Sequence, residues 1–116
     1  MNQYKITITM DDYGNPTYSP STLTAKSKDK VQWVSKAGPF AISFLNDSPF
    51  AEARLHSDLG QDDVYCTRPK TIRANARTHN HYSVAVAVTE PFKGPGGVTV
   101  HLDSGCPEIV VSNDGV

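Results

Sequence analysis

The sequence has few of the features that brace a small protein or anchor one in a membrane. Its 116 residues include two cysteines, one tryptophan and two methionines. No apolar run approaches the roughly 18 residues that a membrane span requires. Eleven Lys and Arg side chains nearly balance twelve Asp and Glu side chains, giving a net charge of −1. This balance argues against nucleic acid or an anionic membrane as a partner.

The length indicates a single domain that spans residues 1–116. A chain of this size buries roughly 65% of its unfolded surface, so it needs neither a disulfide nor a metal to fold. The N-terminal residues alternate in polarity and do not form the charged stretch and apolar core of a signal peptide. We therefore expect a soluble cytoplasmic protein, or the mature form of an exported one whose signal peptide is absent from this chain.

Alternation of apolar and polar residues is the dominant pattern in the chain and predicts half-buried strands. In residues 82–89, Tyr and Val alternate with small residues, which favours a central strand. Turn residues separate the strands at the spacing of a β-sandwich. We predict an all-β, two-sheet Greek-key sandwich of seven to eight strands. The predicted strands are residues 4–10, 21–26, 31–35, 40–45, 70–76, 82–89, 98–103 and 107–112.

The segment 46–70 lacks a regular pattern and is long for a compact domain. Residues 49–56 are compatible with one or two helical turns, with Ser48 as the N-cap. Long excursions often carry function, so we expect partner contacts here, in the Pro/Gly-rich loop 90–97, or along an exposed edge strand.

Two local patterns are similar to the cupredoxin family. Residues 28–34 and 40–44 resemble its charged turn, its Val-x-Trp strand and the strand that follows, and residues 82–86 resemble its Tyr-x-Phe-x-Cys strand. The resemblance implies a cupredoxin-like sandwich. In that family two histidines and a cysteine bind copper, usually with an axial methionine. Here Phe40 stands at the first histidine and Val86 at the cysteine, so a blue-copper site is not expected.

A weaker resemblance is to bacterial inclusion-body proteins of the PixA/AidA type. Their Leu-x-x-x-Ala and Asp-x-Val-x-Trp patterns are similar to residues 23–33, and their Tyr-Ser-Val strand is similar to residues 82–84. Their closing Asp-Pro-x-Ile-x-Val is similar to residues 106–111, with a cysteine in place of the aspartate. This likeness supports a sandwich that ends in such a strand and implies no chemistry.

Three histidines form the candidate metal site. His79 and His81 lie two residues apart, so their rings share a face if the strand begins there. Such a pair can chelate copper or zinc, and His101 on a later strand is a candidate third ligand. The alternative is that these are exposed polar side chains at a strand end.

Cys66 and Cys106 both lie in loop sequence next to proline. They are either two free, partly buried thiols or one long-range disulfide, which would add roughly 3–4 kcal/mol of stability. Both alternatives stay open at this point.

Basic and aromatic residues in loops are the candidates for ligand or partner contact. The one basic concentration lies between residues 68 and 77, and an anionic ligand or a solvated edge strand explains it equally well. Trp33, Phe44 and Tyr82 alternate on strands and are expected in the core. The candidate contact residues are Arg68, Arg73, Arg77, Tyr13 and Phe92.

No catalytic signature is present, so we expect no enzyme and assign no catalytic residues. The sequence favours a non-catalytic binding or assembly module that needs no cofactor. Its partner would be a protein or a second copy of itself, because edge strands pair readily. The alternative function is copper or zinc binding through the strand-end histidines.

Overall fold

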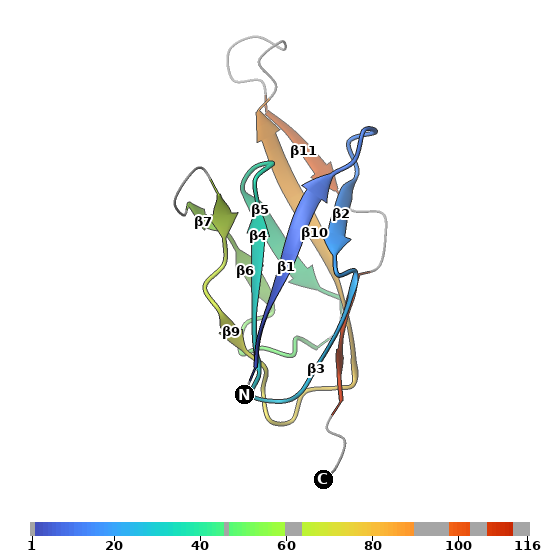
Figure 1. Ribbon diagram of the computed structural model, residues 1–116, viewed down its shortest axis with the longest axis vertical. Coiled ribbons are helices and arrows are strands. Elements are labelled where there is room, and N and C mark those ends of the chain that lie inside the picture. The colour runs from blue at the N-terminus through green and yellow to red at the C-terminus, as the bar shows by residue number, and fades with distance from the viewer. Residues whose placement is uncertain (1, 46, 60–63, 90–97, 103–106, 113–116) are drawn as a thin grey trace.

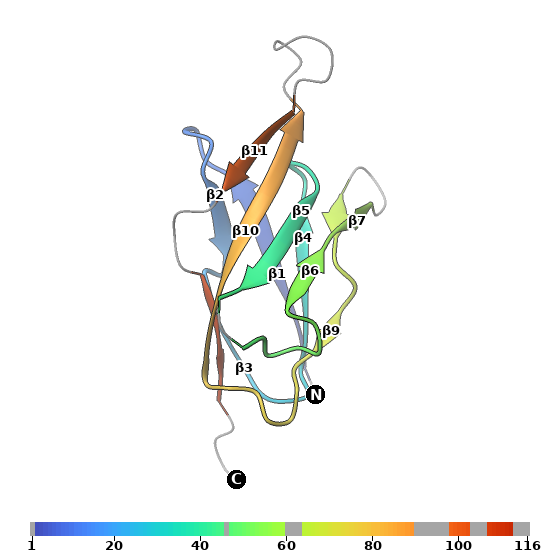
Figure 2. The ribbon, with the colours of Figure 1, turned by 180° about the vertical axis from the view of Figure 1, so that it is seen from behind.

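The computed structural model describes residues 2–45, 47–59, 64–89, 98–102 and 107–112, which form an all-β, two-sheet sandwich as predicted. The first sheet contains β1 (Gln3–Met10), β2 (Pro16–Ser19), β4 (Lys30–Ser35), β7 (Asp58–Leu59), β8 (Tyr65–Cys66) and β9 (Lys70–Thr71). The second sheet contains β3 (Thr22–Ala25), β5 (Phe40–Phe44), β6 (Arg54–His56), β10 (His79–Thr89), β11 (Val98–Leu102) and β12 (Glu108–Val111). Figure 1 shows the first sheet in front, and Figure 2 shows the second sheet from the opposite side.

Both sheets are mixed. In the first, β1 pairs in parallel with β4 and antiparallel with β2, in the order β2-β1-β4-β8-β7, and β9 also pairs with β4. In the second, β3 pairs in parallel with β12, in the order β3-β12-β10-β5-β6, and β11 also pairs with β10. The central position predicted for the strand at residues 82–89 is confirmed, since β10 pairs with β5, β11 and β12.

The core is an aromatic cluster between the sheets. Trp33, Tyr82 and Phe44 are at most 8% exposed, which confirms that they are core residues. The Trp33 and Tyr82 rings meet edge to face with centroids 5.5 Å apart, and Phe50 meets Trp33 at 5.8 Å. Such pairs contribute about 0.5–1.5 kcal/mol beyond the area that they bury.

Several predicted boundaries differ from the observed ones. The described residues form twelve strands because β2, β6, β7 and β8 were not predicted, and all four are short. The strand predicted at 70–76 ends at Thr71, and β10 begins at His79, three residues earlier than predicted.

The helical turns predicted for residues 49–56 are absent, since no described residue of that segment is helical. The Ser48 hydroxyl accepts a hydrogen bond from the Phe50 amide at 3.0 Å, which makes a turn rather than a helix start. Phe50 is 1% exposed. Burial of its ring against the core outweighs local helix propensity, and the chain continues into β6.

The connection between β4 and β5 crosses from one sheet to the other and passes close to β10. A Cβ atom at Gly38 would collide with the carbonyl oxygen of Ala87, so this position requires glycine. The Ala87 amide donates to the Pro39 carbonyl at 2.9 Å, which fixes the crossing in place.

No helix among the described residues has the length and apolarity to cross a membrane.

Candidate functional site

The histidine pair lies beside a carboxylate that the sequence did not single out. His79 and His81 are on the outer face of β10, as the spacing predicted, and Glu108 lies opposite His81 on β12. The Glu108 Oε2 atom is 3.1 Å from His79 Nδ1 and 3.5 Å from His81 Nε2. Both rings are thus engaged by one partly buried carboxylate.

The third predicted ligand is placed elsewhere along β10. The backbone of His101 in β11 lies opposite Val86, which is five residues beyond His81. At about 3.4 Å per residue, this separates the two backbone positions by roughly 17 Å along the strand. Within the described part of the chain, no three or more His, Cys, Asp and Glu side chains are arranged to hold a metal ion.

Two buried apolar residues occupy the positions that the cupredoxin resemblance aligns with copper ligands. Phe40 of β5 and Val86 of β10 are direct cross-strand partners, and they are 4% and 0% exposed. Neither side chain carries a donor atom, and both pack into the core. The donor chemistry of a blue-copper centre therefore does not fit these positions.

Of the predicted basic contact residues, Arg73 serves the fold. Its Nη2 atom donates to the Ser48 carbonyl at 2.6 Å and its amide donates to the Pro49 carbonyl at 2.7 Å. These bonds hold the turn that buries Phe50. Arg77 instead forms an exposed ion pair with Asp47, with 3.3 Å between Arg77 Nε and Asp47 Oδ2.

Arg68 lies in a polar cleft at the side of the sandwich where β6 is an edge strand, which we call the open side. The cleft runs between β6, the edge strand of the second sheet, and the part of the first sheet that β7 and β9 form. Its volume is about 310 Å³. The lining residues are Glu52, Arg54, Leu55, His56, Asp58, Arg68 and Lys70.

The charges in this cleft do not cancel. Lys70 and Glu52 pair at 2.8 Å across the cleft and neutralise each other. Two arginines, Arg54 and Arg68, then face one remaining acid, Asp58. Among the described residues neither arginine has an ion-pair partner within 4.0 Å, so both guanidinium groups stay available to an anionic ligand.

The β6 strand also presents unpaired backbone to the open side. Ser57 donates its amide to Phe40, and the Ala53 carbonyl accepts from Phe44, so these groups point toward β5. Hydrogen-bonding groups alternate along an antiparallel strand, so the amides and carbonyls of Arg54 and His56 point the opposite way. No described strand pairs with that edge.

Tyr13 is displayed at the tip of the β1–β2 hairpin with 90% of its surface exposed. The Asp11 carboxylate accepts hydrogen bonds from the amides of Asn15 and Tyr13 at 2.8 and 2.9 Å. These backbone donors, Asn15 first, lower the pKa of Asp11 below its ordinary value. Gly14 has a φ of 80°, which favours glycine at this turn. The second aromatic candidate, Phe92, lies outside the described residues.

Cys66 lies in β8, where it is partly buried and opposite Val34 of β4. Cys106 lies outside the described residues. The disulfide between them stays a prediction.

Besides Glu108, the residues that the sequence analysis missed are Arg54 and His56 of the cleft. They flank Leu55, which is 3% exposed, so the triplet shows the polar-apolar-polar alternation of an edge strand. That alternation was the one available signal. It is too short to be distinguished from the irregular sequence around it.

Comparison with known proteins adds no family to this description. Neither a scan against models of protein families nor a search of curated proteins gave a match.

Proposed function

We propose that this protein is a non-catalytic binding module whose partner is a protein segment that is extended and acidic. The segment would lie in the cleft between the β6 edge and the strands β7 and β9 of the first sheet. The observation that carries the proposal is the presence of two ion-pair-free arginines, Arg54 and Arg68, beside an unpaired strand edge.

Two kinds of contact support this choice of partner. The outward amides and carbonyls of Arg54 and His56 suit a strand added to the edge of a sheet. Guanidinium groups bind carboxylates through paired hydrogen bonds, which adds specificity for acidic side chains. The Lys70–Glu52 pair links β9 to the segment that precedes β6, across the cleft.

The test uses two labelled peptides, acetyl-Glu-Val-Glu-Val-Glu-amide and its counterpart with Lys in place of Glu. We expect the acidic peptide to bind and to shift the amide resonances of Arg54 and His56. The variant Arg54→Ala/Arg68→Ala should weaken its binding about tenfold, since each exposed charge pair contributes up to about 1 kcal/mol. The measurement is fluorescence anisotropy, repeated at raised salt, which should weaken binding further.

Arg77→Ala is the matched control, because Arg77 is an exposed arginine outside the cleft. It should bind the acidic peptide as the wild type does. Equal binding of the lysine peptide, or unchanged binding by the double variant, would contradict the proposal. A native mass spectrum of the same samples tests self-association, the other form of assembly expected from the sequence.

Metal binding remains the second candidate function, supported by the convergence of His79 and His81 on Glu108. Both rings would have to release Glu108 or share it with the metal. Titration with zinc(II) or copper(II) under native mass spectrometry is the test. One metal per chain that is lost in His79→Ala/His81→Ala would favour this function, and no uptake would exclude it.

A further inference from the structure

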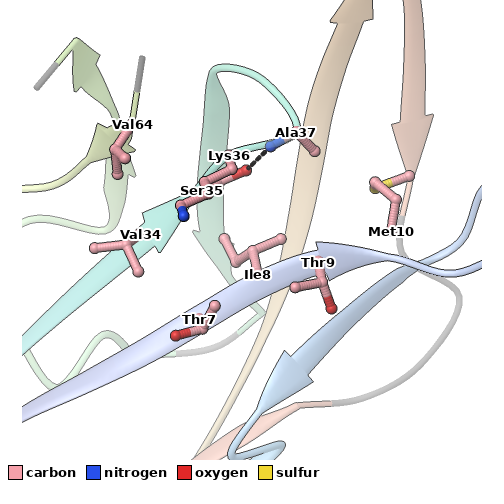
Figure 3. A pocket seen from close by; sticks show the side chains of 9 residues that line it. All are labelled: Thr7, Ile8, Thr9, Met10, Val34, Ser35, Lys36, Ala37 and Val64. Carbon is pink, nitrogen blue, oxygen red and sulfur yellow. Dashed lines mark hydrogen bonds between the residues drawn. The ribbon is translucent and has the colours of Figure 1, made fainter. Parts of the chain in front are cut away.

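The strands β1 and β4 diverge at the end of the first sheet away from the N-terminus (Figure 1). A hollow lies where they separate, and Figure 3 shows the side chains that line it. The parallel pairing of the two strands ends at Ile8 and Ser35. Beyond this point Thr9 and Met10 continue in β1 and pair with β2. The β4 strand instead turns at Lys36 toward the second sheet.

The separation of the strands is fixed by contacts on both sides. Gly38 packs directly on the Ala87 carbonyl, and the Ala87 amide donates to Pro39 at 2.9 Å. On the other side, Met10 of β1 is held in register with Pro16 of β2. The β1 strand continues into the hairpin with β2 and the β4 strand continues into the connection to β5, so no pairing among the described strands closes the space between them.

The hollow has a volume of about 500 Å³, within the usual range for small-molecule sites of about 300–1,000 Å³. Ile8 is 1% exposed and forms part of its floor, while Met10 and Ala37 are partly buried. Figure 3 shows the Ile8 side chain rising from β1 toward the Lys36–Ala37 turn. The lining residues are Thr7, Ile8, Thr9, Met10, Val34, Ser35, Lys36, Ala37 and Val64.

Two of the polar groups in this lining are already used by the protein. The Ser35 hydroxyl accepts a hydrogen bond from the Ala37 amide at 3.1 Å, and the Thr9 hydroxyl is 2.6 Å from that of Thr17. Lys36 is the one charged lining residue. Among the described residues it forms no ion pair, so its ammonium group lacks an acidic partner.

We propose that this hollow binds a small amphipathic carboxylic acid. The apolar part of the ligand lies against Met10 and Ala37, which line the hollow and are partly buried. Its carboxylate lies at the rim and pairs with Lys36. An apolar pocket with one oriented charge is the usual arrangement for such ligands, because the pocket supplies affinity and the charge supplies orientation.

The test uses three probes with the same alkyl chain and different head groups, namely decanoate, decanol and decyltrimethylammonium. Each is titrated into the full-length, isotope-labelled protein while amide resonances are followed by NMR. We expect decanoate to bind most tightly and to shift the amides of Ile8, Met10 and Ala37. The amides of Arg54 and Arg68 should not move, which separates this site from the cleft.

Lys36→Met removes the charge and keeps most of the length of the side chain. It should weaken decanoate binding about three- to tenfold and leave decanol binding unchanged, as expected for one partly exposed ion pair. Lys5→Met is the matched control. Lys5 is also an exposed lysine of the first sheet, but it does not line the hollow.

Ala37→Phe fills the hollow from the turn that follows β4 and should abolish binding of all three probes. Val64→Phe is a second filling variant, used if the first loses the dispersed amide spectrum of a folded protein. Decanol that binds as tightly as decanoate would overturn the assignment of an acid. Shifts confined to other parts of the protein, or decanoate binding that survives both filling variants, would overturn the site.

Discussion

The two ends of the sandwich differ in how side chains close the core between the sheets. At the end near the N-terminus, the Phe50 ring closes the core beneath Trp33, and Arg73 holds the turn that carries it. Two backbone hydrogen bonds of Ile72 stabilise the same end. The Lys28 amide donates to the Ile72 carbonyl, and the Ile72 amide donates to the Asp29 carbonyl, both at 2.9 Å. At the opposite end, the strands β1 and β4 diverge around an apolar hollow.

Two arginines show which polar groups stabilise the closed end and which are left for a ligand elsewhere in the molecule. Arg73 and Arg68 are five residues apart, and the sequence marks both as contact candidates. Arg73 satisfies backbone carbonyls of the turn at residues 48–50, whereas Arg68 lies at the open cleft with no described partner. A buried polar group without partners is costly, so polar side chains at the closed end are expected to serve stability.

The largest expected effect is that of Phe50→Ala at the closed end. Removing a ring that is 1% exposed leaves a cavity against Trp33 and Phe44, so the free energy of unfolding should fall by about 3–5 kcal/mol. Urea denaturation measures it. Met10→Ala is the matched variant at the open end and should cost less than half as much, because Met10 already lines a hollow. Equal losses of unfolding free energy in the two variants would show that the two ends are packed equally well.

The second effect concerns the arginine of the closed end. Arg73→Ala removes a charged hydrogen bond to the Ser48 carbonyl, and the free energy of unfolding should fall by about 1.5–3 kcal/mol. Arg77→Ala breaks only the exposed ion pair with Asp47 and should change it by less than about 1 kcal/mol. The same denaturation experiment measures both, and similar losses for the two variants would refute the separate roles assigned to them.

The central strand of the second sheet was predictable from the sequence because its local periodicity is strong. The alternation in residues 82–89 identified the central strand and its core face, because a buried strand imposes a period of two. The turn at residues 48–50 was misread as a helix start, since a serine accepts amide bonds in both settings. The burial of Phe50 decides between them, and that depends on contacts with residues far away in the sequence.

The same reasoning explains what was found and missed at the candidate sites. Arg68 was identified because basic residues are concentrated around it, and the shared face of His79 and His81 follows from their spacing. Glu108 was missed because strand pairing brings it to the histidines from 27 or more positions away. Arg54 was missed because the fold places it across a cleft from Arg68, which is 14 positions away. Sequence spacing does not encode such pairings.

The smallest predicted effect is the acid sensitivity of the closed end. Asp29 is 4% exposed, and its carboxylate accepts hydrogen bonds from the amides of Asn2 and Lys26 at 2.9 and 3.0 Å. These donors, Asn2 first, lower its pKa below the ordinary value of 3.8. A carboxyl group whose pKa is lower in the folded state stabilises the fold fully above its unfolded pKa. That contribution is lost as the pH falls through the folded pKa.

Asp29→Asn should therefore reduce stability by about 1 kcal/mol at neutral pH and flatten the loss of stability below pH 3.8. Urea denaturation at a series of pH values measures both. Asp11→Asn is the comparison at the open end, since the Asp11 pKa is also lowered by backbone donors but its hairpin tip is exposed. If the closed end owes its stability to buried polar contacts, Asp29→Asn should change the pH profile more than Asp11→Asn. The reverse order would place the acid-sensitive contact in the hairpin and contradict the contrast between the two ends.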